Sequence, residues 1–411
     1  QRQMCIRDRH YVNCKQWKGR KMEAYDFDRI TDRRNTFSYK WDIKEGELPM
    51  WVADMDFETA PCVKEALIRR AEHGIFGYSV VPQEWNRAIC GWWQRRHHFQ
   101  MQEDWLIFCT GVIPAIDVAV KRMTNVGDNV VVQTPVYNIF YNCVENHGRH
   151  VLENRLLYEK GQYEMDFEDL EKKLANPQTT MLLLCNPQNP AGKIWSKEEL
   201  ARVGALCKKH HVLVVADEIH CDLTMPGYAY VPFASVSDDC KYNSITCLAP
   251  SKTFNMAGLQ SAAVMIPDEA IREKMDRGLN SDEVAEPNAF AMAGTIAAFT
   301  EGDAWLDSLR SYLKESRDMV AAFLAGKLPQ IHLVENTATY LLWLDCSKVT
   351  DDTDHLQEFL RKETGLYLSK GSGYHGNGNL FLRMNIACPH TAVKEGLMRL
   401  ARGIQLFEKT K

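Results

Sequence analysis

The sequence lacks a long apolar run and an excess of either charge. No stretch approaches the roughly 20 apolar residues that span a bilayer, so we expect no membrane-spanning segment. Its 411 residues include 49 Lys and Arg against 54 Asp and Glu, which gives a net charge of -5. A chain this balanced has no electrostatic footprint for nucleic acid or an anionic membrane. With 45% hydrophobic residues, its composition is that of a globular protein.

Paired cysteine spacings are also absent. The 13 cysteines are scattered singly, their number is odd, and no two form a Cys-x-x-Cys pair. Thiols inside apolar runs act as small hydrophobic groups, so we expect free cysteines and a reducing cytoplasm. His147 and His150 are three residues apart, but no Cys or carboxylate shares their pattern, so we predict no metal site.

The first 21 residues lack the pattern of a folded segment. They contain no apolar stretch of the kind that a secretory signal peptide requires, and residues 4–9 show no periodicity. We expect residues 1–21 to be a non-native or disordered extension outside the fold. Met22 opens the first segment with the character of a fold.

Short apolar runs then alternate with helical patterns. The runs are apolar without alternation, which is typical of strands buried on both faces. They lie at residues 105–109, 129–132, 181–185, 212–216, 244–248 and 262–266. Ser196 and Glu199 form a capping box, Asp166 is placed to cap a second helix, and Pro61 and Gly74 bound a third. This alternation predicts an α/β domain with a mainly parallel sheet flanked by helices.

The pattern changes near residue 300. We expect one long helix at 303–324, a helix at 354–364 and a final helix at the end of the chain. Short strands are expected at 331–334, 339–344, 365–368 and 380–384. This part of the chain therefore predicts a smaller α+β unit.

Polar residues follow the predicted strands, where open α/β sheets bind ligands. Gly111 and Val112 open a helix whose backbone N–H groups and dipole would favour a phosphate, although the motif taken alone favours a tight strand–helix turn. Tyr137 could stack on a planar ring or be a half-buried core tyrosine. Asn189 lies between two Asn-Pro steps in a rigid loop, which holds its amide at the same edge.

Two strand ends carry charges. Asp217 directly follows an apolar strand, where a carboxylate is costly without a partner such as a protonated ring nitrogen; an ion-paired or helix-capping aspartate is the alternative. Lys252 follows another apolar strand, where desolvation would lower the pKa of its amine and make it a nucleophile. The alternative is a surface lysine whose amine extends to solvent. A phosphate cradle, a stacking ring, an amide, a carboxylate and a lysine together match pyridoxal 5'-phosphate (PLP).

Seven motifs carry a resemblance to a known family. They are Lys-Trp-Asp at 40–42, Trp-Val-Ala-Asp-Met-Asp-Phe at 51–57, Gly-Tyr-Ser at 77–79, Asn-Pro-Gln-Asn-Pro at 186–190, Asp-Glu-Ile-His at 217–220, Ser-Lys-Thr-Phe-Asn at 251–255 and Arg-Met-Asn-Ile-Ala-Cys-Pro at 383–389. In this order they resemble the fold-type I PLP enzymes of the class I/II aminotransferase superfamily, most closely the C–S β-lyase branch with the cystathionine β-lyases. The resemblance runs from about Tyr25 almost to the C-terminus.

This resemblance implies a domain division. It implies a large PLP-binding domain at 61–299, a small C-terminal domain at 300–411, and an N-terminal segment at 22–60 that packs with the small domain. It also implies that Lys252 forms the Schiff base with PLP and that Asp217 partners the pyridine nitrogen.

The same resemblance implies further roles. Asn189 would bond the phenolic oxygen of PLP and Tyr137 would stack on its ring. Gly111, Val112 and Ser251 would hold the phosphate.

Two more roles concern the substrate and the subunits. Tyr78 is implied to reach the phosphate of a neighbouring subunit, in a homodimer with shared active sites. Arg383 is implied to bind the substrate α-carboxylate, for which a two-pronged guanidinium is suited.

Four positions depart from the wider family. His220 is a cofactor-binding candidate where a tyrosine is usual, and Gln260 replaces an arginine that usually binds phosphate. Both changes are typical of the lyase branch, and the second leaves the phosphate with one less positive charge. Residues 373–376 stand where a Phe-Gly pair is expected, and Gln188 stands where a histidine is common. The sequence therefore does not define the substrate pocket.

The expected activity is PLP-dependent β-elimination of cysteine S-conjugates such as L-cystathionine, which yields a thiol, pyruvate and ammonia. An aminotransferase acting on an amino acid and a 2-oxo acid is the alternative, because both reactions begin with removal of the Cα proton. Spacing alone does not separate the two, whereas the branch resemblance favours elimination. A regulatory binding role, which could coexist with catalysis, is a third possibility.

Overall fold

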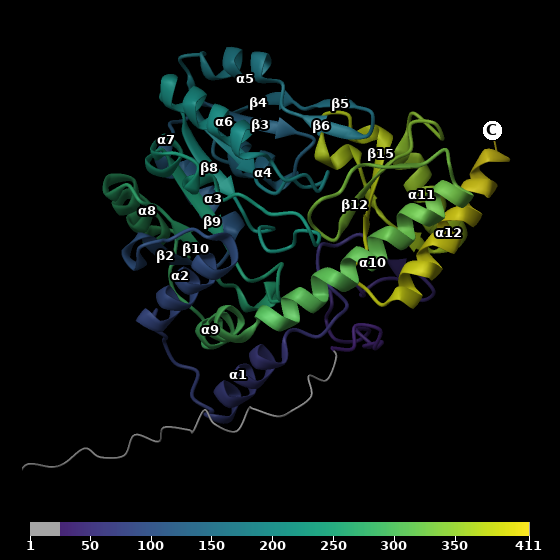
Figure 1. The fold of residues 1–411 in the computed structure, drawn as a ribbon, viewed down its shortest axis with the longest axis horizontal. Helices are drawn as coiled ribbons and strands as arrows, with labels where there is room; N and C mark the ends of the chain where they lie inside the picture. Colours follow the sequence, from purple (N-terminus) through teal and green to yellow (C-terminus); the bar gives the residue numbers. More distant parts are fainter. Residues whose placement is uncertain (1–24, 411) are drawn as a thin grey trace, which may run out of the picture.

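The computed structural model describes residues 25–410. The predicted extension at residues 1–21 lies outside these described residues. The described chain forms a large sheet with its helices and a smaller sheet beside it (Figure 1). The long helix α10 (Asp303–Lys327) runs past both parts. The sequence pattern predicted a long helix at 303–324.

The larger sheet has seven strands in the order β2-β10-β9-β8-β7-β3-β4. Their bounds are Leu106–Cys109 (β2), Asn129–Thr134 (β3), His150–Arg155 (β4), Thr179–Cys185 (β7), Leu213–Asp217 (β8), Ser244–Leu248 (β9) and Ala262–Met265 (β10). The strands β4, β3, β7, β8 and β9 run parallel, whereas β10 is antiparallel to β9 and β2. The prediction of a mainly parallel sheet is confirmed.

The edge strand β4 was not predicted. Its sequence mixes apolar and polar residues, and its two end residues, His150 and Arg155, are exposed. An edge strand need not be apolar on both faces, so a search for continuous apolar runs passes over it. Its buried Asn154 is satisfied by polar partners, since it accepts a bond from Gln133 (3.2 Å) and donates one to Asp169 (2.8 Å).

Helices cover both faces of this sheet. Their bounds are Pro61–Glu72 (α1), Gln83–His97 (α2), Val112–Met123 (α3), Ile139–Glu145 (α4), Phe167–Leu174 (α5), Lys197–Lys209 (α6), Asp238–Tyr242 (α7), Glu269–Ser281 (α8) and Ala291–Glu301 (α9). One core joins α3, α4 and α8 to side chains such as Val130 and Val132, and another joins α5 and α6 to Val131. Successive residues of β3 thus face opposite layers.

The predicted helix starts are present. Ser196 Oγ accepts the backbone N–H of Glu199 (3.1 Å), while the Glu199 carboxylate accepts that of Ser196 (2.7 Å), which completes the capping box. Asp166 likewise accepts the N–H of Asp169 (2.9 Å) at the start of α5. No helix among residues 25–410 is long and apolar enough to span a membrane.

The smaller sheet has four strands in the order β11-β12-β15-β14, all antiparallel. Its elements are His332–Leu333 (β11), Leu341–Asp345 (β12), Ser369–Lys370 (β14) and Phe381–Asn385 (β15), with the helices Thr353–Thr364 (α11) and His390–Glu408 (α12). A separate hairpin joins Leu157–Glu159 (β5) to Gln162–Glu164 (β6).

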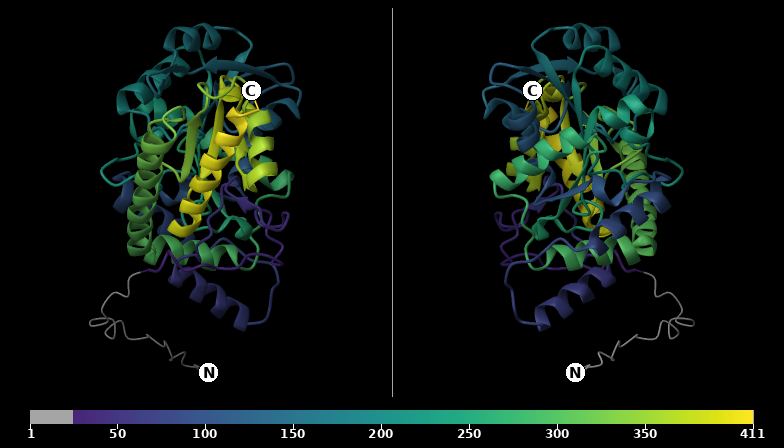
Figure 2. Two further views of the ribbon diagram at one scale, coloured as in Figure 1. Left: turned by 90° about the vertical axis from the view of Figure 1, so that its right-hand side faces the viewer. Right: turned by 90° about the vertical axis from the view of Figure 1, so that its left-hand side faces the viewer.

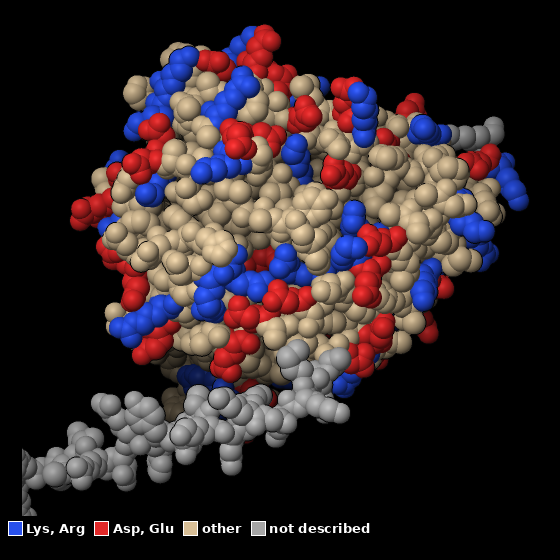
Figure 3. All heavy atoms as spheres, viewed as in Figure 1, with Lys and Arg blue, Asp and Glu red and all other residues tan. Residues whose placement is uncertain are grey.

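Charges of both signs are mixed over the face seen in Figure 3, as the balanced composition led us to expect.

The N-terminal segment contacts the C-terminal part of the chain. Its strand Leu48–Pro49 (β1) pairs in parallel with Leu366–Tyr367 (β13), and Met50 accepts the N–H of Asn385 (2.8 Å). Farther along, Asp56 donates its N–H to Ala387 (2.8 Å). The exact division at residues 22–60, 61–299 and 300–411 stays a prediction.

The capping box gives a test of local stability. Ser196→Ala removes the bond to the Glu199 N–H, so we expect it to lower the free energy of unfolding by about 1 kcal/mol. Ser311→Ala, on exposed helix surface inside α10, is the matched control and should change it by less than about 0.5 kcal/mol. Urea unfolding followed by circular dichroism measures both, and equal effects would contradict the capping role.

Candidate active site

A cavity of about 220 Å³ lies at the carboxyl ends of the large sheet's central strands. It is lined from the start of α3, from the loops after β3, β7, β8 and β9, from Ala53 and from β15. Nine of the ten predicted site residues line it: Gly111, Val112, Tyr137, Asn189, Asp217, His220, Ser251, Lys252 and Arg383. The tenth, Tyr78, does not line this cavity and is 100% exposed in the single chain.

Lys252 lies inside the cavity rather than at the surface. Its Nζ donates a hydrogen bond to the backbone oxygen of Ala53 (2.7 Å). Burial, and next the positive charge of Arg383, lower the pKa of Lys252 to about 8, against the opposing effects of Asp54 and Asp217. A large share of this amine is therefore neutral, and so nucleophilic, just above neutral pH.

Asp217 is a buried carboxylate without an ion pair among residues 25–410. It ends β8, it is 5% exposed, and one of its oxygens accepts the N–H of Ile219 (3.1 Å). Burial raises the pKa of Asp217 to about 6, with the Ile219 N–H and Lys252 opposing this shift. The carboxylate is ionised at neutral pH at a cost, which a cationic group in the cavity would offset.

His220 contributes a neutral ring beside these charges. It is 3% exposed, and its Nδ1 has no hydrogen-bond partner. Burial, followed by the charges of Lys252 and Arg383, lowers the pKa of His220 to about 3. The ring is therefore uncharged at neutral pH, with an unpaired nitrogen beside the cavity.

Arg383 comes from β15 of the smaller sheet, so the cavity lies between the two sheets. It donates to the side-chain oxygen of Asn189 (3.1 Å) and to the backbone oxygen of Trp51 (3.0 Å). Its Nε has no partner, and its guanidinium lies 5.0 Å from the centre of the Tyr374 ring. Tyr374, in the unusual 373–376 segment, thus supports the arginine, which keeps a donor free for a carboxylate.

The loop of Asn189 is fixed by Gln188, the residue at the usual histidine position. The Gln188 side chain donates to the backbone oxygen of Pro135 and accepts the N–H of Ala191 (2.9 Å). It does not line the cavity. Gln188 therefore acts on the position of the loop.

The opposite end of the cavity suits an anion. Gly111 is the N-cap of α3, and no side chain caps the helix there. A Cβ at Gly111 would lie 3.1 Å from the Pro114 ring, which is a tight contact. Uncapped N–H groups and the hydroxyls of Ser251 and Ser261 offer donors without a charge, and Gln260 adds a neutral side chain where an arginine was expected.

A buried network that the sequence did not reveal supports the lysine loop. Asp222 accepts bonds from Trp92 (2.8 Å) and Thr253 (3.0 Å) and pairs with His97 (2.8 Å). These bonds lower the pKa of Asp222 even though burial alone would raise it. Because Thr253 follows Lys252, the network helps to fix the lysine loop.

Two groups bear on metal binding. His97, Cys221 and Asp222 have the spacing to hold an ion, but the Asp222 oxygens are already occupied by hydrogen bonds. His147, considered above, pairs with the distant Asp117 (2.8 Å), a carboxylate that the local sequence pattern did not reveal.

The model of the family "aminotransferase class I and II" matches residues 48–400. The chain belongs to this family. Cystathionine beta-lyase PatB of Bacillus subtilis (strain 168) is 44% identical over 91% of this chain and 98% of its own length. Protein MalY of Escherichia coli (strain K12) is 32% identical over 93% and 99%.

Solved structures agree with this family. Cystalysin from Treponema denticola, whose crystal structure contains PLP, superposes with a TM-score of 0.90 at 31% identity, over 93% of this chain and 99% of that chain. The fold-type I expectation is thereby confirmed. The aminotransferase fold explains why the cavity forms at the strand ends, where the loops after β7, β8 and β9 converge.

Two buried aspartates allow a stability test, because replacing each by Asn should change the free energy of unfolding at pH 8 in opposite directions. The pKa of Asp217 rises from 3.8 unfolded to about 6 folded, so its ionisation costs stability as pH rises from about 4 to 7. In the cofactor-free chain, Asp217→Asn should therefore raise the free energy of unfolding by roughly 2–3 kcal/mol at pH 8 and change it little at pH 4.

Asp222→Asn is the matched control. The folded-state pKa of Asp222 is lowered, so its ionised form stabilises the fold above its unfolded pKa. This variant should be less stable than the wild type at pH 8. Urea titrations at pH 4 and pH 8 measure both variants, and destabilisation by Asp217→Asn at pH 8 would contradict the unpaired, buried carboxylate.

Proposed function

We propose that this protein is a PLP-dependent C–S β-lyase that releases a thiol, pyruvate and ammonia from cysteine S-conjugates of the L-cystathionine type. One observation carries the proposal. A half-buried lysine of lowered pKa and a buried carboxylate without an ion pair share one cavity. They do so in a chain that matches cystathionine beta-lyase PatB over 98% of that relative's length.

The residues present fit PLP. Lys252 would bond the aldehyde carbon, and Asp217 would accept the pyridine N–H and so receive the cationic partner that it lacks. Asn189 would donate to the phenolic oxygen, and Tyr137 would stack on the ring.

The uncapped start of α3 at Gly111 and Val112, with Ser251, would hold the phosphate. His220 and Gln260 add no charge there. The phosphate would thus be held mainly by neutral donors.

The bound cofactor supplies an electron sink for the negative charge that develops at the substrate Cα. The chain supplies the rest. Arg383 binds the α-carboxylate and orients the Cα–H bond. The Lys252 amine, released when the substrate binds, would remove the Cα proton. Sulfur leaves Cβ as a thiolate, and the remaining three-carbon enamine hydrolyses to pyruvate and ammonia.

Activity on L-cystathionine tests the assignment. The PLP-loaded protein should release homocysteine and pyruvate in equal amounts with no 2-oxo acid present. Lys252→Ala should lose this turnover by at least about 10³-fold, together with the visible absorbance of the bound cofactor. Lys121→Ala, on the exposed surface, should keep both.

Two results would contradict the lyase. Turnover only after addition of 2-oxoglutarate and a donor amino acid would assign an aminotransferase. Full activity in Lys252→Ala would remove the lysine from the mechanism altogether.

The protein is further proposed to be a homodimer with shared active sites. Tyr78 belongs to the segment that joins α1 to α2. Figure 2 shows this segment as a dark-blue loop at the edge of the molecule. Ile75, Phe76 and Val80 of this segment are exposed as well. An exposed apolar segment of this kind favours contact with a second copy, where Tyr78 would reach the partner's phosphate.

Mixing two inactive variants tests the shared site. Tyr78→Ala and Lys252→Ala should each be impaired alone. Random mixed dimers would rebuild one intact site each, so an equal mixture should recover about one quarter of the wild-type activity. Recovery is measured after unfolding and refolding the mixture; no recovery would show that Tyr78 does not act across subunits.

The cellular location is proposed from the thiols. All 11 cysteines among the described residues are free, and most are buried. Such a set favours the reducing cytoplasm.

A further inference from the structure

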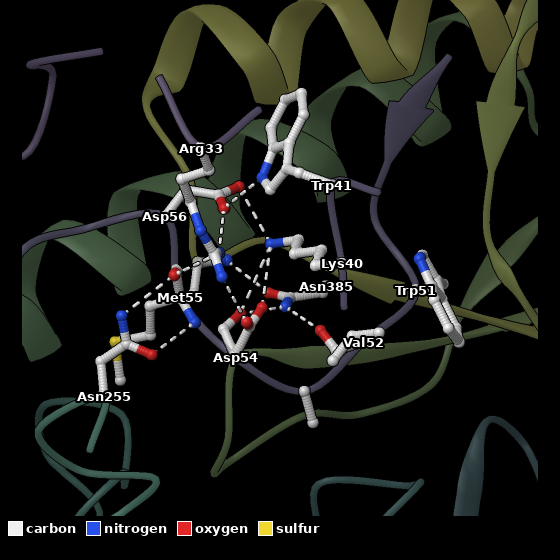
Figure 4. A network of polar contacts seen from close by, with 12 residues as sticks. Arg33, Lys40, Trp41, Trp51, Val52, Asp54, Met55, Asp56, Asn255 and Asn385 are labelled. Atoms are coloured by element: carbon white, nitrogen blue, oxygen red, sulfur yellow. Dashed lines mark hydrogen bonds and ion pairs between the residues drawn. The ribbon is translucent and has the colours of Figure 1, made fainter. Parts of the chain in front are cut away.

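Four charged side chains gather beside the active-site cavity (Figure 4). Lys40 is 1% exposed, and its Nζ lies 2.9 Å from an oxygen of Asp56 and 3.7 Å from one of Asp54. Arg33 spans the same two carboxylates, with nitrogens 2.7 Å from each. The two positive and two negative charges balance. We call this set the charge cluster.

Nothing in the proposed reaction uses these charges directly. None of the four side chains lines the cavity. A buried lysine held by two carboxylates loses much hydration free energy, so its presence needs a reason other than stability alone. The reason lies in the segment that carries Asp54 and Asp56.

That segment, residues 51–57, passes between the two parts of the active site. Asn385, two residues after Arg383, donates to two of its carbonyl oxygens (2.5 and 2.6 Å). Asn255, three residues after Lys252, bonds an N–H and two carbonyl oxygens of the segment (2.9–3.0 Å). Strand β15, which carries Arg383, and the loop that carries Lys252 therefore both hold this segment.

The segment in turn contacts both site cations. The Ala53 carbonyl accepts from Lys252 Nζ (2.7 Å) and from the Tyr340 hydroxyl (3.1 Å). The Trp51 carbonyl accepts from Arg383 (3.0 Å). A small shift of the segment would therefore move the acceptors of both cations together.

We propose that the charge cluster is a positioning device for catalysis: it fixes segment 51–57 against Lys252 and Arg383 and keeps the net charge beside Lys252 at zero. Its members act through the segment and are positioning residues. The inference rests on the proposed function, because it assigns Lys252 as the reactive amine.

The charged groups that face Lys252 predict the direction in which its pKa should shift when the cluster is altered. Asp54 and Asp217 raise the pKa of Lys252, Arg383 lowers it, and His220 is neutral. Removing one member of the cluster leaves an unbalanced charge beside the amine. Asp54→Asn leaves a positive excess, which should lower the pKa of the amine, whereas Lys40→Met leaves a negative excess, which should raise it.

The pH dependence of cofactor absorbance tests this in the PLP-loaded protein. The midpoint of the visible absorbance change of PLP bound to Lys252 should fall in Asp54→Asn and rise in Lys40→Met, each by roughly 0.5–1 pH unit. Both variants should also lower kcat for L-cystathionine. In the cofactor-free chain, the pH midpoint for amine labelling of Lys252, followed by mass spectrometry, should shift in the same directions.

Arg149→Met is the matched control. Arg149 is also a buried cation, bonded to Thr124 and to three backbone oxygens, but it precedes β4, at the opposite end of the sheet. Its loss should lower stability and leave both midpoints unchanged.

Midpoints that do not move, or that move the same way in both variants, would overturn the inference. If Lys40→Met does not fold, Asp54→Asn decides, because Arg33 and Lys40 still pair with Asp56 in it. Failure of the proposed function gives a different result, since the wild type itself would then release no homocysteine and pyruvate from L-cystathionine in the absence of a 2-oxo acid. The labelling midpoint would still report the charge beside the amine.

Discussion

Asp217 is buried at the end of β8, and Lys252 is half-buried in the loop after the neighbouring strand β9. Neither forms an ion pair among the described residues. Each pKa is shifted toward the neutral form, to about 6 and about 8 respectively. Burying these groups without an ion pair lowers the free energy of unfolding, and the other residues of the site surround them. A bound cofactor that offered a ring N–H to Asp217 and an aldehyde to Lys252 would offset this cost and make the lysine reactive.

The parallel sheet makes this arrangement possible. Its strands end at one edge, so loops after β7, β8 and β9 deliver an amide, a carboxylate and an amine to a single cavity. The smaller sheet adds Arg383, and segment 51–57 contacts both Arg383 and Lys252. The site therefore depends on a three-way contact between the N-terminal segment and both sheets, with the charge cluster fixing the segment.

Much of this was predictable from local sequence. The buried strands read as apolar runs, the capping box at Ser196 is a local pattern, and the polar residues at strand ends pointed to the cavity. The edge strand β4 was missed because an exposed edge permits polar residues. The Asp222 network was missed because its partners His97 and Trp92 lie 125 and 130 residues away.

The sequence by itself determined the fold class, the family and nine of the residues that line the cavity, since each depends on periodicity or on short motifs. Only the tertiary structure decided which charges are compensated. Asp217 ends β8 and Asp222 follows five residues later, yet burial raises the pKa of the first and hydrogen bonds lower that of the second. Likewise, Lys40 is recognisable as a buried ion pair only once Asp54 and Asp56 lie beside it. Protonation depends on distance and dielectric environment, which the order of residues does not specify.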